Sequence, residues 1–171
     1  MVLLVQYTLI FASVLALVAL GGCFSEHSGV INIGLEGIMV MGALGGALAM
    51  KFLPVTTPGI VLFILIVLAS VLVGMAFSLL LGFAAIHFNA DQTLVGTALN
   101  LMGTAVAVVI VRAINVAENP DNVSSTVVYR QAKQVFLVKI GDFEFNWFML
   151  IIVLAIIASH IVLYRTKFGL R

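Results

Sequence analysis

Two polar side chains lie within a stretch that is otherwise apolar enough to cross a lipid bilayer. The stretch covers residues 28–50 and contains Asn32 and Glu36. An ionisable side chain at membrane depth costs about 2.5–3.5 kcal/mol on insertion scales, so it is retained mainly where it faces protein, water or cargo. A carboxylate is equally favoured in the first turn of a helix, where backbone N–H groups are free and the dipole is positive. Glu36 therefore has two interpretations, recognition along a membrane path and support of a helix start.

A second polar set follows the spacing of one helical face. A threonine, a threonine, an asparagine and a threonine stand at i, i+4, i+7 and i+11, as Thr93, Thr97, Asn100 and Thr104. Such a stripe lines a water-filled path or packs against another helix, and a threonine hydroxyl can also bond to its own backbone. Glu36 lies eight residues beyond Ser28, and Asn100 lies seven residues beyond Thr93, where the two apolar stretches begin. At roughly 1.5 Å per residue, both lie about 10–12 Å from the same membrane surface. We expect one polar region, a candidate translocation path, lined by Asn32, Glu36, Thr93, Thr97, Asn100 and Thr104.

No arrangement of residues points to bond-making chemistry. The sequence has no paired histidines at ligand spacing, no cysteine cluster, no phosphate-binding loop and no nucleophile next to a base. Its single cysteine, Cys23, excludes an intrachain disulfide. We expect no catalytic site, no metal site and no cofactor.

The composition requires an integral membrane protein. Hydrophobic residues make up 63% of the 171 residues and charged residues only 9%, whereas soluble domains are apolar for about half of their residues. The net charge of +1 provides no basic surface for nucleic acid. We expect an all-α polytopic membrane protein, a single domain over residues 1–171, with five transmembrane helices near residues 2–21, 30–50, 60–86, 93–111 and 147–164.

The segment 113–146 has the polar composition of a region outside the membrane. Residues 135–140 and 143–146 flank Gly141 and Asp142, a pattern that predicts a β-hairpin. The positive charges give only a slight preference for placing this segment inside.

Small residues mark the expected helix contacts. They recur at every fourth position, which lets two backbones approach closely inside a membrane. We expect two packing stripes, one with Gly42 and Gly46, and one with Ser70, Gly74, Ser78 and Gly82.

Three segments resemble a known family. Residues 21–39 (Gly-Gly-Cys-Phe-Ser-Glu-His-Ser-Gly-Val-Ile-Asn-Ile-Gly-Leu-Glu-Gly-Ile-Met), residues 89–100 and residues 165–171 occur here in the expected order. They are similar to membrane permease subunits of bacterial ABC importers for nucleosides and simple sugars, in the broader group that includes ribose and branched-chain amino-acid permeases. The resemblance implies a multi-pass subunit of the bacterial inner membrane with a cytoplasmic C-terminal tail. This orientation makes residues 113–146 an extracytoplasmic segment, against the slight preference from the charges. It also implies a second permease subunit, a pair of cytoplasmic ABC ATPases that hydrolyse the ATP, and an extracytoplasmic substrate-binding protein.

The tail resembles the beginning of the loop that contacts the ATPase, with Thr166, Gly169 and Arg171 as its candidate residues. Family members continue beyond Gly-Leu-Arg, so we expect this chain to correspond to the N-terminal part of a permease. The alternatives are a self-contained channel or proton-coupled carrier that uses Glu36, and a fragment without transport activity. A polar path suits a nucleoside and a sugar equally well, and the resemblance modestly favours nucleosides.

Overall fold

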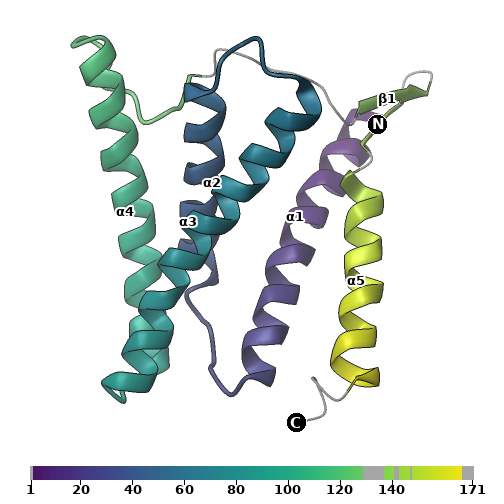
Figure 1. Cartoon of the computed structure of the whole chain (residues 1–171), viewed down its shortest axis with the longest axis vertical. Coiled ribbons are helices and arrows are strands. Elements are labelled where there is room, and N and C mark those ends of the chain that lie inside the picture. The colour runs from purple at the N-terminus through teal and green to yellow at the C-terminus, as the bar shows by residue number, and fades with distance from the viewer. Residues whose placement is uncertain (1, 129–136, 141–142, 147, 167–171) are drawn as a thin grey trace. The chain divides into compact units, whose positions relative to one another are not determined.

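The computed structural model describes residues 2–128, 137–140, 143–146 and 148–166. These residues form five helices and a two-stranded sheet (Figure 1). Four of the helices, α1–α4, are long and apolar enough to cross a membrane, and α5 is a shorter apolar helix. The predicted all-α polytopic class is therefore confirmed. The elements are α1 (Val2–His27), α2 (Leu35–Phe52), α3 (Gly59–His87), α4 (Gln92–Glu118), β1 (Leu137–Ile140), β2 (Phe143–Asn146) and α5 (Phe148–Arg165).

The chain forms two compact units. Unit 1 comprises Met1–Ile31 and Gln134–Arg171, and unit 2 comprises Asn32–Lys133. Unit 1 therefore holds α1, α5 and the strands, and unit 2 holds α2, α3 and α4.

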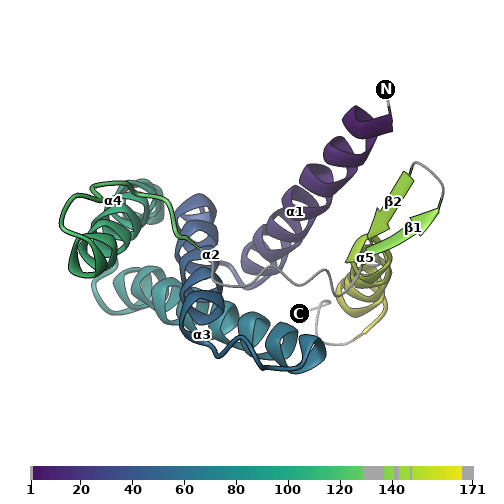
Figure 2. The same ribbon diagram turned by 90° about the horizontal axis from the view of Figure 1, so that it is seen from above.

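In unit 1, α1 packs against α5 near their C-terminal ends. The ring of Tyr164 lies 6.0 Å from the ring of His27 and 5.1 Å from that of His160, measured between centroids. The strands β1 and β2 pair antiparallel with Ile140 opposite Phe143, as expected for the hairpin (Figure 2). The turn residues 141–142 and the first predicted strand residues, 135–136, lie outside the described residues.

In unit 2, α2 is the central helix and packs against both α3 and α4 (Figures 1 and 2). Its glycines allow this, because they remove side chains from two sides of the helix. A Cβ at Gly37 would meet the backbone of α4 at Leu99, and a Cβ at Gly45 would meet Val73 of α3. The helix backbones therefore lie close together on both sides of α2.

Two helix boundaries in unit 2 differ from the prediction. α2 begins at Leu35 and not near residue 30, because residues 28–34 do not form helix. α4 continues to Glu118 and not to residue 111, so it extends into the segment that was predicted to lie outside the membrane. Near both boundaries α2 and α4 contact each other, at Gly37 close to the start of α2 and between Lys51 and Glu118 at the end of α4.

Candidate functional site

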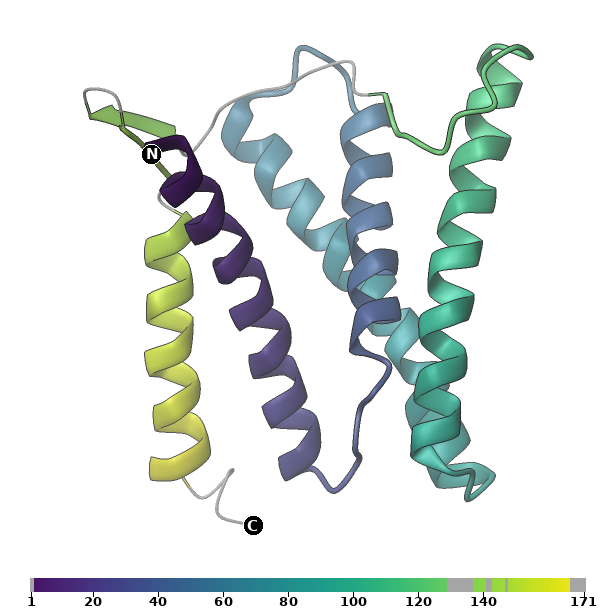
Figure 3. The same ribbon diagram turned by 180° about the vertical axis from the view of Figure 1, so that it is seen from behind.

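Asn100 of α4 binds the beginning of α2 through both ends of its side-chain amide. Its Oδ1 accepts a hydrogen bond of 2.7 Å from the backbone N–H of Gly37. Its Nδ2 donates a hydrogen bond of 3.0 Å to the carbonyl oxygen of Ile33. One side chain therefore pairs with the backbone on both sides of the point where α2 starts. Figure 3 shows the beginning of α2 beside α4.

This arrangement replaces an ordinary helix cap. The first N–H groups of a helix have no partner within the helix, and a Ser, Thr, Asp or Asn at the N-cap usually accepts from them. Gly34 occupies the N-cap of α2 and provides no side-chain acceptor. Asn100 supplies that acceptor from 63 residues further along the chain. The discontinuity before α2 is thus stabilised by a second helix.

Four glycines, two on α4 and two at the start of α2, bring the two backbones close enough for these hydrogen bonds. A Cβ built on Gly103 would lie 2.9 Å from the Cα of Gly37, and one on Gly96 would lie 2.9 Å from the backbone nitrogen of Gly34. Gly96 and Gly103 were not among the predicted packing residues. Their spacing of seven residues, with Asn100 between them, marks the α4 face that contacts α2 and could have indicated them.

Asn32 lies in the extended stretch before α2. Its Oδ1 is buried and has no hydrogen-bond partner among the residues that the structure describes. Since a buried polar atom without a partner costs about 1–3 kcal/mol, it is usually retained for a reason other than stability. Asn32 therefore provides an acceptor at the same discontinuity that Asn100 stabilises.

Glu36 is the second residue of α2 and is exposed in this chain. The start of α2 has no hydrogen bond from a capping side chain of its own. Among the described residues, no ion pair or hydrogen bond involves the Glu36 carboxylate. Its position in the first turn still places it in the favourable field of the helix dipole. Of the predicted polar region, Asn100 thus binds the backbone at the start of α2, Asn32 precedes that start, and Glu36 follows it with an exposed side chain.

The threonines of the predicted stripe do not bind α2. Thr97 donates its hydroxyl to the carbonyl of Thr93 at 2.7 Å, and Thr104 donates to the carbonyl of Asn100 at 3.0 Å. All three threonines are exposed. The hydroxyls of Thr97 and Thr104 therefore bond to their own helix, as threonine hydroxyls often do in membranes.

Replacing Thr97 by valine should change the stability of the protein by no more than about 0.5 kcal/mol, as for an ordinary exposed site. The hydroxyl bonds only to its own helix backbone, and valine keeps the branched shape. Thermal unfolding of the detergent-solubilised protein measures this, and a loss of several kcal/mol would show that Thr97 has a partner besides its own helix.

The small residues predicted for packing divide into two groups. Around Gly42 and Gly46, α2 approaches α3 at Ser70 and Gly74, with a Cβ at Gly42 only 3.3 Å from the Ser70 carbonyl oxygen. Gly82 differs, because a Cβ built there would have nothing within 4 Å. Ser78 is half-buried and donates its hydroxyl to the carbonyl of Met75 within α3.

The predicted residues of the tail are only partly described. The Thr166 hydroxyl donates to the Val162 carbonyl at the end of α5. Gly169 and Arg171 lie outside the described residues.

Comparison with known proteins identifies the protein family of this chain. The family described as branched-chain amino acid transport system / permease component matches residues 4–171, and the chain belongs to this family.

Two relatives cover nearly all of the chain. The guanosine ABC transporter permease protein NupQ of Bacillus subtilis (strain 168) is 35% identical over 99% of this chain and 54% of its own length. The nucleoside ABC transporter permease protein NupC of Lactococcus lactis subsp. cremoris (strain MG1363) is 33% identical over the same shares. The chain thus spans about half the length of these curated relatives. No solved structure matches it.

Proposed function

We propose that the chain is part of the membrane permease of an ATP-driven ABC importer, with a nucleoside as its cargo. The observation that carries this proposal is the similarity of 99% of the chain to two permeases whose names specify guanosine and nucleoside transport. A sugar is the alternative cargo of the same family group. In this proposal the chain has no catalytic site, and a partner subunit hydrolyses the ATP.

The start of α2 is the proposed polar part of the translocation path. Asn32 offers a buried acceptor, and Glu36 offers an exposed carboxylate four residues later. Nucleosides carry N–H and O–H donors that match both groups. Thr93, Thr97 and Thr104 extend the proposed path along α4. The hydroxyls of Thr97 and Thr104 donate to the helix backbone, and their oxygens can still accept.

The proposed partners and orientation follow the family. They are a second permease subunit, a pair of cytoplasmic ABC ATPases and an extracytoplasmic substrate-binding protein, all at the bacterial inner membrane. The C-terminal tail is cytoplasmic in this proposal, and Thr166, Gly169 and Arg171 begin the loop towards the ATPase.

Uptake of labelled guanosine by cells that carry the complete locus tests the proposal. Uptake should require the partner ATPase, and excess unlabelled nucleoside should compete with it whereas glucose should not. Competition by glucose and not by nucleoside would indicate that the cargo is a sugar. Uptake that persists after inactivation of the ATPase and follows the proton gradient would replace it with a proton-coupled carrier.

Replacing Glu36 by glutamine should lower the rate of uptake about tenfold, which corresponds to about 1.4 kcal/mol in a rate-limiting step. The amide keeps the size of the side chain and removes the charge that would accept cargo donors. Initial rates of guanosine uptake, normalised to the amount of protein in the membrane, measure the effect. An unchanged rate with reduced thermal stability would assign Glu36 to the support of the helix start.

A further inference from the structure

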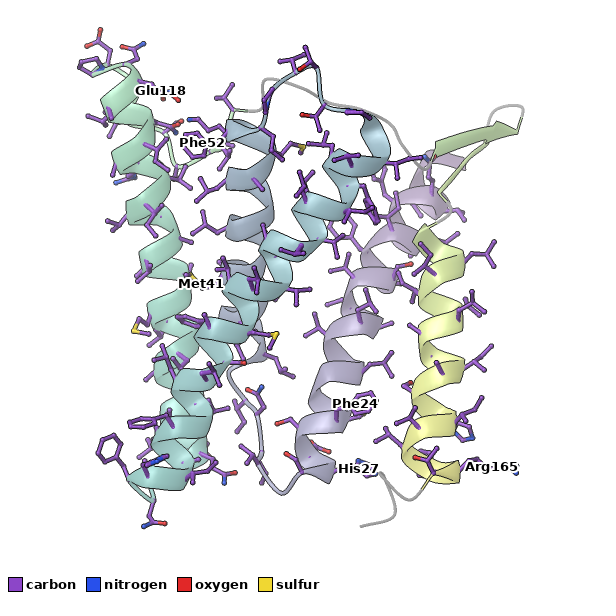
Figure 4. All side chains as sticks on the ribbon, viewed as in Figure 1. Phe24, His27, Met41, Phe52, Glu118 and Arg165 are labelled. Carbon is purple, nitrogen blue, oxygen red and sulfur yellow. The ribbon has the colours of Figure 1, made fainter. Side chains whose placement is uncertain are left out.

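A second polar cluster joins α2 to α4 at the opposite end of α2. Lys51, in the last turn of α2, is only 4% exposed. Its Nζ lies 3.0 Å from the Glu118 carboxylate and donates to Asn115 Oδ1 at 3.4 Å. Figure 4 labels Glu118 near the end of α4 and Phe52, the neighbour of Lys51, at the end of α2. These three residues form a clasp that ties the two helix ends together, in which Lys51 and Asn115 are buried and the side chain of Glu118 is 47% exposed.

The position of the lysine explains how its charge is tolerated. Helix C-termini carry a partial negative charge, and α2 and α4 both end near the ammonium group. A buried ammonium without partners would be strongly unfavourable, so the pairing with Glu118 and Asn115 is a condition for its burial. If α2 moved away from α4 here, the lysine would lose both partners at once. The clasp therefore opposes separation of the helices.

Asn115 also holds the segment that follows α4. Its Nδ2 donates to the carbonyl oxygens of Ser124 at 2.9 Å and of Thr126 at 3.0 Å. Asn115 is 1% exposed, and it is the largest fully buried side chain among the described residues. One asparagine thus connects the end of α2, through Lys51, with the strap formed by residues 119–128.

An asparagine of α4 thus binds each end of α2. Asn100 binds the beginning of α2, and Asn115, fifteen positions later on α4, binds its last turn. Between them, Gly37 and Gly103 place the two backbones in direct contact. At each end, separation of the helices would leave buried polar groups unpaired. These are the N–H of Gly37 at one end and the side chains of Lys51 and Asn115 at the other.

We propose that α2 and α4 move as one rigid body during transport, fastened at both ends by Asn100 and Asn115, and that the strap moves with them. Conformational change in unit 2 then takes place outside this helix pair. The inference relies on the proposed function only for the existence of two states to compare.

Spin labels test the rigidity directly. Phe52 and Val116 are exposed neighbours of the clasp residues, so Phe52→Cys with Val116→Cys leaves Lys51, Asn115 and Glu118 intact. The pair is introduced into the complete transporter with Cys23→Ala and no other cysteines. The distance distribution between the labels is measured in the resting state and with ATP trapped on the ATPase subunits. We expect the same single narrow peak in both states, and a shifted or divided peak would overturn the proposal.

Asn115 variants separate the two connections of the clasp. Asn115→Leu should broaden the distance peak, whereas Asn119→Ala, a change at an exposed residue of the strap, should not. Asn115→Asp keeps an acceptor for Lys51 and loses the donor to the strap, so it should keep a narrow peak while proteases cleave residues 119–128 faster. A narrow distance peak and slow cleavage in all three variants would show that Asn115 holds neither α2 nor the strap in place. The distances require no uptake, so a rigid pair in a transporter without nucleoside uptake would contradict the proposed function alone.

Discussion

Replacing Gly37 by alanine should destabilise the protein by about 1–3 kcal/mol, the typical cost of overpacking, although alanine is the better helix former by about 1 kcal/mol. The new Cβ would collide with the Leu99 carbonyl oxygen and would lie 2.9 Å from the Cα of Asn100. Both are backbone atoms of α4, which cannot turn aside as a flexible side chain can. Relief therefore requires the helices to separate, and that separation stretches the hydrogen bonds of Asn100. Thermal unfolding of the solubilised protein measures the loss.

Gly82→Ala is the matched control for this prediction. It makes the same substitution within a transmembrane helix, at a position where a Cβ has nothing within 4 Å. It should leave the stability unchanged or raise it by at most about 1 kcal/mol through helix propensity. Equal stabilities of the two variants would refute the close approach of α2 and α4 at Gly37.

Replacing Asn100 by leucine should be at least as damaging, because two backbone groups lose their partners together. The buried N–H of Gly37 would be left unpaired, at about 1–3 kcal/mol, and the more exposed carbonyl of Ile33 would lose its partner as well. The start of α2 should then unwind more often. Hydrogen exchange at the Gly37 amide should accelerate, and uptake by the completed transporter should fall with it.

Asn100→Asp refines the same experiment. The carboxylate still accepts from the Gly37 N–H and is favoured at the positive end of α2, but it cannot donate to Ile33. Amide exchange at Gly37 should therefore remain slower in Asn100→Asp than in Asn100→Leu. If Asn100→Leu abolished uptake with no change in exchange or stability, Asn100 would act on the cargo and not on the helix start.

The succession of helices could be predicted because apolar length is a local property. Each of the five apolar runs became a helix, and the alternation around residues 141–142 indicated the hairpin. The predicted start of α2 was several residues too early. The side chain that binds the backbone before this start belongs to Asn100, which is 67 residues away from Ile33. No local pattern at Ile33 contains that information.

The polar region was predicted only in part, for a related reason. The predicted depths put Asn100 level with Glu36, and in the structure Asn100 binds the backbone at the start of α2, but depth alone does not specify which atoms bond. The cluster at the Lys51 end was not predicted at all. Lys51 lies between the predicted helices 30–50 and 60–86, and Asn115 lies in the segment predicted outside the membrane. The lysine in the last turn of an apolar helix was the available signal. Its burial depends on α4 continuing to Glu118.

The function is tested most directly by reconstituting the complete transporter, with its ATPase and binding protein, in proteoliposomes. The measurement is the accumulation of labelled guanosine, with ATP or with a proton gradient as the only source of energy. The proposal predicts accumulation that requires ATP and the binding protein and that does not respond to the gradient. Accumulation driven by the gradient without ATP would contradict it.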